Sequence, residues 1–114
     1  MSASVTESSS FFFTLRDRIE YPTEGVLSKI LFKDKSCQYT LFCMAAGTDI
    51  SEHTSPRNAV INVIEGRGIL TLEGEEIQLE SDIFVFMRAN APHALKAEQN
   101  LAFLLTLSES DRSH

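Results

Sequence analysis

The residues of this sequence with the clearest capacity for chemistry are its histidines. His53 lies in the polar stretch SEHTSP, just ahead of an apolar run, and His93 follows Pro92 at the start of another. The remaining histidine, His114, is the last residue. A neutral imidazole can bind a transition metal or form hydrogen bonds through its ring nitrogens. His53 and His93 are therefore the candidate site residues. The alternatives are a surface side chain at His53 and a partly buried imidazole bonded to backbone at His93.

Other catalytic signatures are missing from the sequence. The glycines mark turns rather than a phosphate-binding loop. No acid is placed recognisably for a serine–histidine triad, and neither cysteine has a histidine nearby in sequence. Cys37 and Cys43 lie on one predicted strand, where they would be roughly 20 Å apart, too far for a disulfide. Two free thiols indicate a reducing compartment, so we expect a cytoplasmic protein.

The overall charge narrows the class of partner. The chain has 114 residues, with 16 acidic and 10 basic side chains and a net charge of −6. This acidity disfavours nucleic acid and anionic membranes as partners. No apolar stretch approaches the roughly 18 residues of a membrane-spanning helix, and no basic region precedes the Phe11–Phe13 run, so we expect no targeting segment.

The elements that must position the histidines are strands, because short apolar runs separated by turn residues fill the chain from residue 26 onward. The runs occupy residues 26–33, 37–47, 58–66, 68–74, 76–80, 82–89, 93–97 and 101–109. No helical pattern intervenes, so the spacing predicts an all-β domain built as an antiparallel sandwich or closed barrel. The SEHTSP stretch is expected to be a polar loop.

The two ends differ from this central region. Residues 1–10 are small and polar and predict a disordered tail, and residues 109–114 are expected to be a C-terminal tail. Residues 11–24 predict a short irregular or helical segment that packs on the barrel or on a partner, with an edge strand as the alternative. The three phenylalanines at its start are expected to be removed from water by covering a hydrophobic edge, in this subunit or in a partner. The barrel itself is expected at residues 25–108.

Two stretches carry information about pairing. GILTLEGEEIQL predicts a β-hairpin with Leu70, Leu72, Ile77 and Leu79 facing inward, because a slip of one residue would turn every apolar side chain outward. The run LAFLLTL near the end of the chain is apolar on both faces, and such a strand needs cover on both. In so short a chain a second subunit could supply that cover, and we expect a homodimer.

The order of these strands and the residues at their turns resemble the cupin superfamily. The first motif of that family runs G-x5-H-x-H, three or four residues, E, six residues, G. Gly47, His53 and Gly66 match the glycines and the first histidine. Ser55 and Ala59 stand in place of the second histidine and the glutamate.

The second cupin motif, G-x5-P-x-G-x2-H-x3-N, is kept literally only at its histidine, His93. Asp82, Arg88, Asn90 and Ala97 occupy its other positions. Asn90 replaces glycine where a left-handed backbone is expected, a conformation that Asn tolerates. The resemblance covers about residues 25–107 and implies a double-stranded β-helix, the jelly-roll or cupin barrel.

The resemblance also implies a metal position. Metal-dependent cupins hold a divalent ion with three histidines and a glutamate, and this chain keeps two of these ligands by position, His53 and His93. At very roughly 3 kcal/mol per ligand, the loss of two weakens binding by about four orders of magnitude. We therefore expect at most a weakly bound divalent transition metal (Zn, Fe, Ni or Mn), with Cys43, Gln38 or Met87 as conceivable further donors.

In the geometry of this family His53 and His93 converge in one cavity. If His53 and Ser55 face inward, strand alternation continues that face with Ala59, Ile61 and Val63, and the imidazoles are expected at the deeper end of the cavity. Such a cavity suits a small, mostly apolar organic ligand with one anionic or hydrogen-bonding end.

Three functions follow from this site. The first is a small dimeric binding module with the ligand inside the barrel, with Arg57 either supplying a counter-charge at the rim or simply solvated. The alternative is a metal-dependent enzyme, dioxygenase- or isomerase-like, with a reduced two-histidine metal site. The third is a structural dimer with a filled barrel.

Overall fold

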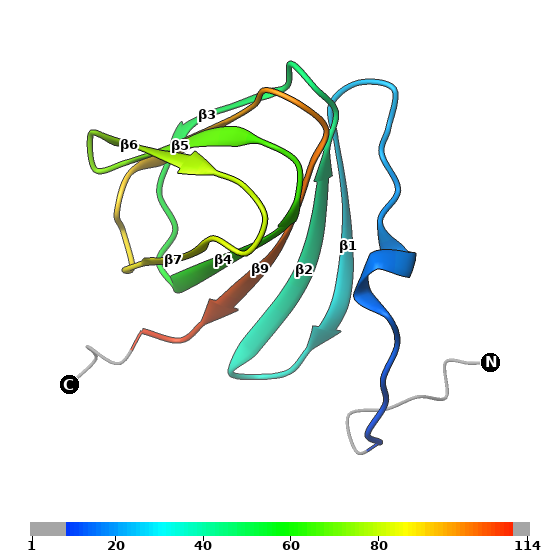
Figure 1. Cartoon of the computed structure of the whole chain (residues 1–114). Helices are drawn as coiled ribbons and strands as arrows, with labels where there is room; N and C mark the ends of the chain where they lie inside the picture. Colours follow the sequence, from blue (N-terminus) through cyan, green and yellow to red (C-terminus); the bar gives the residue numbers. More distant parts are fainter. Residues whose placement is uncertain (1–8, 111–114) are drawn as a thin grey trace.

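The computed structural model describes residues 9–110, whose strands form two antiparallel sheets (Figure 1). A single short 3₁₀ helix, η1 (Leu15–Arg18), precedes the strands in this part of the chain, where no helix is long and apolar enough to cross a membrane. The strands are β1 (Val26–Lys33), β2 (Cys37–Met44), β3 (Asp49–His53), β4 (Asn58–Glu65), β5 (Gly68–Leu72), β6 (Glu75–Leu79), β7 (Phe84–Met87), β8 (His93–Ala97) and β9 (Leu101–Ser108). The predicted all-β jelly-roll barrel is confirmed. The tails predicted at the termini fall largely on residues 1–8 and 111–114, which lie outside the described residues.

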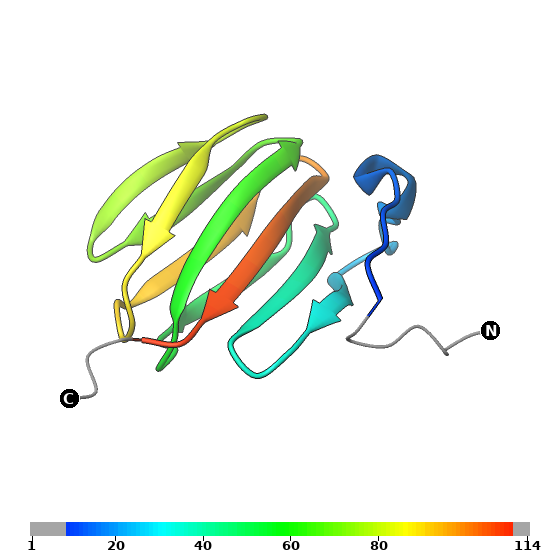
Figure 2. The same ribbon diagram turned by 90° about the horizontal axis from the view of Figure 1, so that it is seen from below.

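The two sheets differ in size and enclose the core between them. The large sheet has the order β1-β2-β9-β4-β7, and the small sheet has the order β3-β8-β5-β6. Figure 2 shows the large sheet as one layer, with the N-terminal segment beside its β1 edge. The last strand, β9, lies in the middle of the large sheet, between β2 and β4. The most apolar stretch of the chain is thus hydrogen-bonded on both edges.

Strand alternation decides which side chains fill the core. On β4, Ala59, Ile61 and Val63 are buried, whereas the residues between them are only partly buried. The predicted hairpin has the expected register, with Leu70 opposite Ile77 and its apolar side chains turned toward the core. Burying one face of each strand in this way stabilises the pairing register as well as the fold.

One strand, β3, is not in the predicted set. Its outward side chains are polar, four of its five residues are exposed, and only Ile50 packs against the core. It lies at an edge of the small sheet and pairs only with β8, with an irregularity between Ile50 and His53. A polar edge strand with one inward apolar residue lacks the alternation by which strands are identified, so the expected loop at His53 is wrong.

The N-terminal segment covers part of the outer face of the large sheet. Its Ile19 and Tyr21 pack on a buried cluster of Leu41, Cys43 and Ala102. The N-terminal segment of the same chain therefore covers part of the outer face of β9, at Ala102. The alternative of an edge strand in residues 11–24 is wrong, because the segment is irregular apart from η1.

The three N-terminal phenylalanines have different environments. Phe11 stacks on Phe13, with ring centroids 6.0 Å apart, and also contacts Phe32 at 5.9 Å. The guanidinium of Arg18 lies 4.0 Å from the centroid of the Phe13 ring. Phe12 is 95% exposed, so it covers no hydrophobic edge within this chain, and cover of its ring by a partner stays a prediction.

A carboxylate at the end of β4 ties the N-terminal segment to the barrel. The Tyr21 hydroxyl donates to Glu65 Oε2 at 2.6 Å, and Arg16 Nη1 donates to Glu65 Oε1 at 2.9 Å. Arg16 also donates through Nη2 to the carbonyl oxygen of Ile64 at 3.1 Å. Burial and the neighbouring Glu65 carboxylate raise the pKa of Tyr21 well above its usual value. The hydroxyl therefore stays protonated and can keep donating across a wide pH range.

Two turns have backbone conformations that restrict the residue type. Gly66, between β4 and β5, has a φ of +100°, and a Cβ atom added there would meet the Asn100 carbonyl oxygen and lie 2.7 Å from Leu101 Cα. Only glycine fits such a position. Asn90, before β8, has a φ of +69°, which confirms the left-handed backbone expected there.

Candidate functional site

A cavity of about 120 Å³ lies inside the barrel, between the two sheets. Its wall comes from strands of both sheets, and most of the side chains that form it are apolar. The lining residues are Phe42, Ile50, His53, Ile61, Met87, His93, Leu95, Phe103 and Leu105. The cavity thus contains two polar side chains, and these are the two histidines singled out from the sequence.

Strand pairing brings the histidines together. His53 at the end of β3 and His93 at the start of β8 are direct cross-strand partners, and their ring centroids lie 4.2 Å apart at an interplanar angle of 60°. His93 is only 7% exposed, whereas His53 is exposed. His53 therefore stands at the opening of the cavity with His93 behind it, and the expectation that both imidazoles lie at the deeper end is wrong for His53.

Hydrogen bonds to backbone fix the chemical state of both neutral rings. His53 Nδ1 lies 2.9 Å from the carbonyl oxygen of Ser51, and His93 Nδ1 lies 2.9 Å from the carbonyl oxygen of Ala91. A carbonyl oxygen only accepts, so each Nδ1 must carry the proton and donate. The lone pair of each neutral imidazole is then on Nε2. The site offers two Nε2 atoms that can accept a hydrogen bond or bind a metal.

Large side chains limit the volume around the histidines. The rings of Phe42 and Phe103 are stacked, with centroids 5.2 Å apart and planes within 2° of parallel. Met87 fills the wall on the β7 side and is buried. A dry cavity of about 150 Å³ can hold benzene, and sites for drug-sized ligands begin near 300 Å³. At about 120 Å³ this cavity suits a molecule of the size of benzene or smaller.

Not all of the other residues predicted to line the cavity do so. Ile61 lines the cavity, as expected from alternation along β4. Ala59 is buried on the same face but does not line the cavity, and Met87 lies opposite it in the register. Ser55 lies beyond the end of β3, where strand alternation no longer applies, and its Oγ accepts the backbone N–H of Arg57. Arg57 is exposed and is not part of the lining.

The residues present do not complete a four-ligand metal site. Of the conceivable further donors only Met87 lines the cavity, because Cys43 packs on the outer side of the large sheet and Gln38 donates to Thr40 Oγ1 at 3.2 Å. Within residues 9–110, no group of three or more His, Cys, Asp or Glu side chains could hold a metal ion. The site supplies two imidazole ligands, too few for the tight structural coordination of a divalent ion.

The apolar wall was missed from the sequence. Phe42, Phe103 and Leu105 lie on β2 and β9, whose runs are apolar on both faces, so alternation did not separate inward from outward residues. The signal that could have found them is the register. Phe42 pairs with Phe103, and Leu105 lies beside Ile61, which was already assigned to the cavity.

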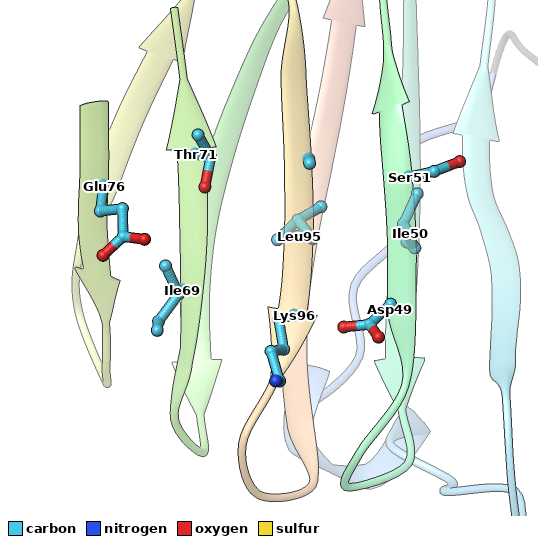
Figure 3. Close-up of a pocket in the computed structure, with 9 residues that line it drawn as sticks. Asp49, Ile50, Ser51, Ile69, Thr71, Glu76, Leu95 and Lys96 are labelled. Carbon is cyan, nitrogen blue, oxygen red and sulfur yellow. The ribbon is translucent and has the colours of Figure 1, made fainter. Parts of the chain in front are cut away.

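A second and larger hollow lies on the outside of the small sheet (Figure 3). This groove of about 380 Å³ is open to solvent, and its rim includes the charged side chains of Asp49, Glu76 and Lys96. Thr71 and Ser51 add hydroxyl groups, and neither histidine takes part. Size favours the groove, but enclosure and the convergence of two imidazoles favour the barrel cavity as the ligand site.

Comparisons with known proteins give the same picture of the barrel. The family model described as Cupin domain matches residues 40–107. The structure resembles a cupin superfamily protein from Desulfitobacterium hafniense, with a TM-score of 0.81 and 22% identity over 90% of this chain and 94% of that one. It also resembles a cupin 2 conserved barrel domain protein from Leptotrichia buccalis, with a TM-score of 0.80 and 28% identity over 85% of this chain and 47% of that one.

A more distant likeness is to a variant of salicylate 1,2-dioxygenase from Pseudoaminobacter salicylatoxidans, with a TM-score of 0.70 and 20% identity. It covers 74% of this chain and 27% of the dioxygenase chain. A search of curated proteins found no match to this sequence. At these identities the solved structures support the fold.

Proposed function

The chain belongs to the cupin family, and we propose that it is a binding protein that holds a small organic ligand inside the barrel. The observation that supports this proposal is the pair of histidine Nε2 atoms in an otherwise apolar cavity of about 120 Å³. A few convergent polar groups in an apolar cavity are typical of ligand sites, where they orient the ligand and provide specificity.

The chemistry of the cavity indicates the class of ligand. A neutral imidazole accepts a hydrogen bond at Nε2, so the ligand presents a hydroxyl or an acid group there. A carboxylic acid could also transfer its proton to an imidazole and remain bound as the anion beside it. The stacked Phe42 and Phe103 rings require an apolar body. The ligand we propose is therefore a small alcohol or carboxylic acid whose whole molecule is no larger than benzene.

The proposal includes a homodimer in the cytoplasm. Cys37 and Cys43 are both free thiols, as expected for a reducing compartment. A second copy is included because the outer face of the large sheet is apolar beyond the part that the N-terminal segment covers.

A second candidate function is a metal-dependent enzyme, dioxygenase- or isomerase-like. The specific observation that favours it is that both backbone-bonded histidines leave Nε2 free, the arrangement in which imidazoles bind metal. Two imidazoles and water molecules could hold an ion weakly. This candidate requires a metal ion held by two imidazoles, with the Met87 thioether as the one further donor in the lining, whereas the ligand-binding proposal needs no metal.

One experiment separates the two candidates. Protein purified without chelator is measured by native mass spectrometry and by elemental analysis, together with His93→Ala and the control Lys96→Ala in the outer groove. The binding proposal expects a small organic mass, or saturable binding of small carboxylic acids and alcohols, that His93→Ala abolishes and Lys96→Ala retains. Stoichiometric metal lost in His93→Ala would favour the enzyme. A barrel that binds neither would contradict both, and loss of binding only in Lys96→Ala would move the site to the groove.

A further inference from the structure

The groove on the outside of the small sheet has three charged side chains around it. Asp49 lies on β3, Lys96 on β8 and Glu76 on β6, and all three are exposed. Figure 3 shows the two carboxylates on opposite sides of the groove, with Lys96 on a strand between them. The groove therefore combines two acidic groups and one basic group, and its volume of about 380 Å³ is in the usual range for small-molecule sites.

Short side chains form the middle of this groove. Ala94 on β8 pairs with Thr71 on β5, and Ser51 on β3 also lines the groove. Strand alternation turns Ala94 and Thr71 outward, since their neighbours Leu95 and Leu70 belong to the core. The longer charged side chains stand around these short ones, which leaves a hollow. Its floor offers the methyl groups of Ala94 and Thr71 to an aliphatic chain.

The three charges are not neutralised within the described part of the chain. Asp49 and Lys96 are direct cross-strand partners, positions at which opposite charges attract each other. Even so, none of the ion pairs within residues 9–110 includes a residue of the groove, and no hydrogen bond there engages these three side chains. Each group is therefore available to a ligand group of opposite charge.

The spacing of the three groups matches one kind of molecule. Lys96 and Asp49 lie opposite each other on adjacent strands, where Cβ atoms are about 5 Å apart. Glu76 is more remote, because it pairs with Thr71, which pairs with Ala94. Two strand spacings and two residues thus separate Glu76 from Lys96, about 12 Å between Cα atoms. This pattern complements an ammonium and a carboxylate on one carbon, with a second cation at the end of a chain.

Simpler ligands leave part of this pattern unmatched. A diamine would place positive charge beside Lys96, and a neutral amino acid would leave Glu76 without a partner. A dicarboxylate would meet the two acidic groups of the groove. The net charge of −6 also attracts cations and repels anions. The charges therefore select a ligand with two cationic groups and one carboxylate.

We propose that this groove is a second ligand site, which binds a basic α-amino acid such as lysine or arginine. The α-carboxylate pairs with Lys96, the α-ammonium with Asp49 and the side-chain cation with Glu76. The aliphatic chain lies over Ala94 and Thr71. Because the charged groups are exposed, each ion pair contributes little, and we expect a dissociation constant of about 1 mM. The inference goes beyond the proposed barrel ligand and does not depend on it, since neither histidine lines the groove.

The test is a titration of the full chain with lysine at low salt, followed by ¹H–¹⁵N nuclear magnetic resonance. This measurement detects millimolar binding and locates it. We expect saturable shifts of the amide signals of β5 and β8. Lysine should bind about threefold or more tightly than pentane-1,5-diamine, which lacks the carboxylate. It should exceed norleucine, which lacks the distal cation, by a similar factor.

Matched variants assign the charges one by one. Lys96→Ala should weaken lysine about threefold or more without weakening pentane-1,5-diamine, and Glu76→Gln should weaken lysine but not norleucine. The control is Glu75→Gln, the same change on the same strand outside the lining, which should leave all three affinities unchanged. His93→Ala, which removes an imidazole from the barrel, should bind lysine as before.

Several outcomes would overturn the groove site. Equal binding of lysine and pentane-1,5-diamine would mean that Lys96 holds no carboxylate. Equal losses in Glu75→Gln and Glu76→Gln would show attraction by the acidic surface in general. Shifts away from β5 and β8, no saturable shift at tens of millimolar, or loss of lysine binding in His93→Ala would also contradict it. If Lys96→Ala does not fold, Glu76→Gln decides. An empty barrel that still binds lysine in the groove would overturn the proposed function and leave this site standing.

Discussion

Replacing Phe42 by alanine tests whether the barrel cavity is a real binding volume. The Phe42 ring forms part of its wall and stacks on Phe103 at a centroid distance of 5.2 Å. Its removal should enlarge the space beside His53 and His93 without touching either histidine or its backbone partner. We therefore expect Phe42→Ala to destabilise the protein and to widen the range of ligands that it accepts.

The size of the effect follows from the packing. Removing the ring adds about 100 Å³ of space, which at about 24 cal/mol per Å³ costs about 2.4 kcal/mol of the free energy of unfolding. Loss of the stacked pair adds about 1 kcal/mol. Because Phe42 is only partly buried, we expect a total near 3 kcal/mol, at the lower end of the range for buried phenylalanines. A domain with a stability of about 5–15 kcal/mol remains folded after such a loss.

The assay is urea denaturation followed by far-ultraviolet circular dichroism, with and without benzene. The widened cavity exceeds the roughly 150 Å³ that holds benzene, so benzene should restore part of the lost stability in the variant. At a hundredfold excess over the dissociation constant, the gain is about 2.7 kcal/mol. The unmodified cavity of about 120 Å³ should gain less. Ile30→Ala, at an exposed position, is the matched control and should change stability by about 0.5 kcal/mol or less.

Two results would refute this reasoning. A loss below about 1 kcal/mol for Phe42→Ala would mean that the ring does not pack as a wall of the cavity. Equal stabilisation of the variant and the unmodified protein by benzene would mean that benzene binds elsewhere. An example is the apolar groove that is lined by Phe11, Phe13, Leu31, Phe32, Tyr39 and Leu104.

Three further predictions concern turns, pH and metal. Gly66→Ala should lower the free energy of unfolding by about 3 kcal/mol or more in urea denaturation, because its Cβ would meet the backbone of Asn100 and Leu101. Gly74 has a φ of +86° but open space around it, so Gly74→Ala should cost only about 1–2 kcal/mol. Equal costs would contradict the close approach at Gly66. The pKa of Tyr21 is higher in the folded protein than its usual value of 10.0, so the Tyr21 hydroxyl contributes its full share of stability below about pH 10. Above that pH the contribution falls by at most about 1.4 kcal/mol per pH unit. Tyr21→Phe should therefore make the alkaline fall in the free energy of unfolding shallower. An unchanged slope would show that its bond to Glu65 does not contribute. Finally, a chelator should leave the melting temperature unchanged if the ligand proposal is right, and a fall of several degrees would support a resident metal.

The sequence predicted every strand except β3, but it identified the inward residues only on strands whose two faces differ. Ile61 and the hairpin at Leu70 follow from alternation alone, because a buried face and a solvated face impose a period of two. β3 was missed because its outward residues are polar and a single inward residue, Ile50, makes no period. Phe42 and Phe103 were missed as cavity residues because both faces of their strands are apolar.

The sequence predicted the two histidines of the candidate site but not their arrangement. The positions of His53 and His93 came from a motif, but their separation depends on the pairing of β3 with β8, which no local pattern contains. The backbone hydrogen bond of His93 was one of the alternatives given for that residue, whereas the bond from His53 Nδ1 to Ser51 depends on a side-chain torsion that no sequence pattern contains. Ser55 was assigned to the lining from its position in the same motif, but it lies beyond the end of β3.

The place of β3 at the edge of the small sheet has a consequence for access to the cavity. The strand that carries His53 is hydrogen-bonded along one side only, so local opening there needs less free energy than at β9, which is bonded on both sides. Its amide protons should exchange with solvent sooner than those of β9, and a ligand that touches both rings should slow that exchange. One wall of the barrel is therefore bonded on both sides and the other can open locally, and we expect the proposed ligand to enter and leave on the side on which His53 lies.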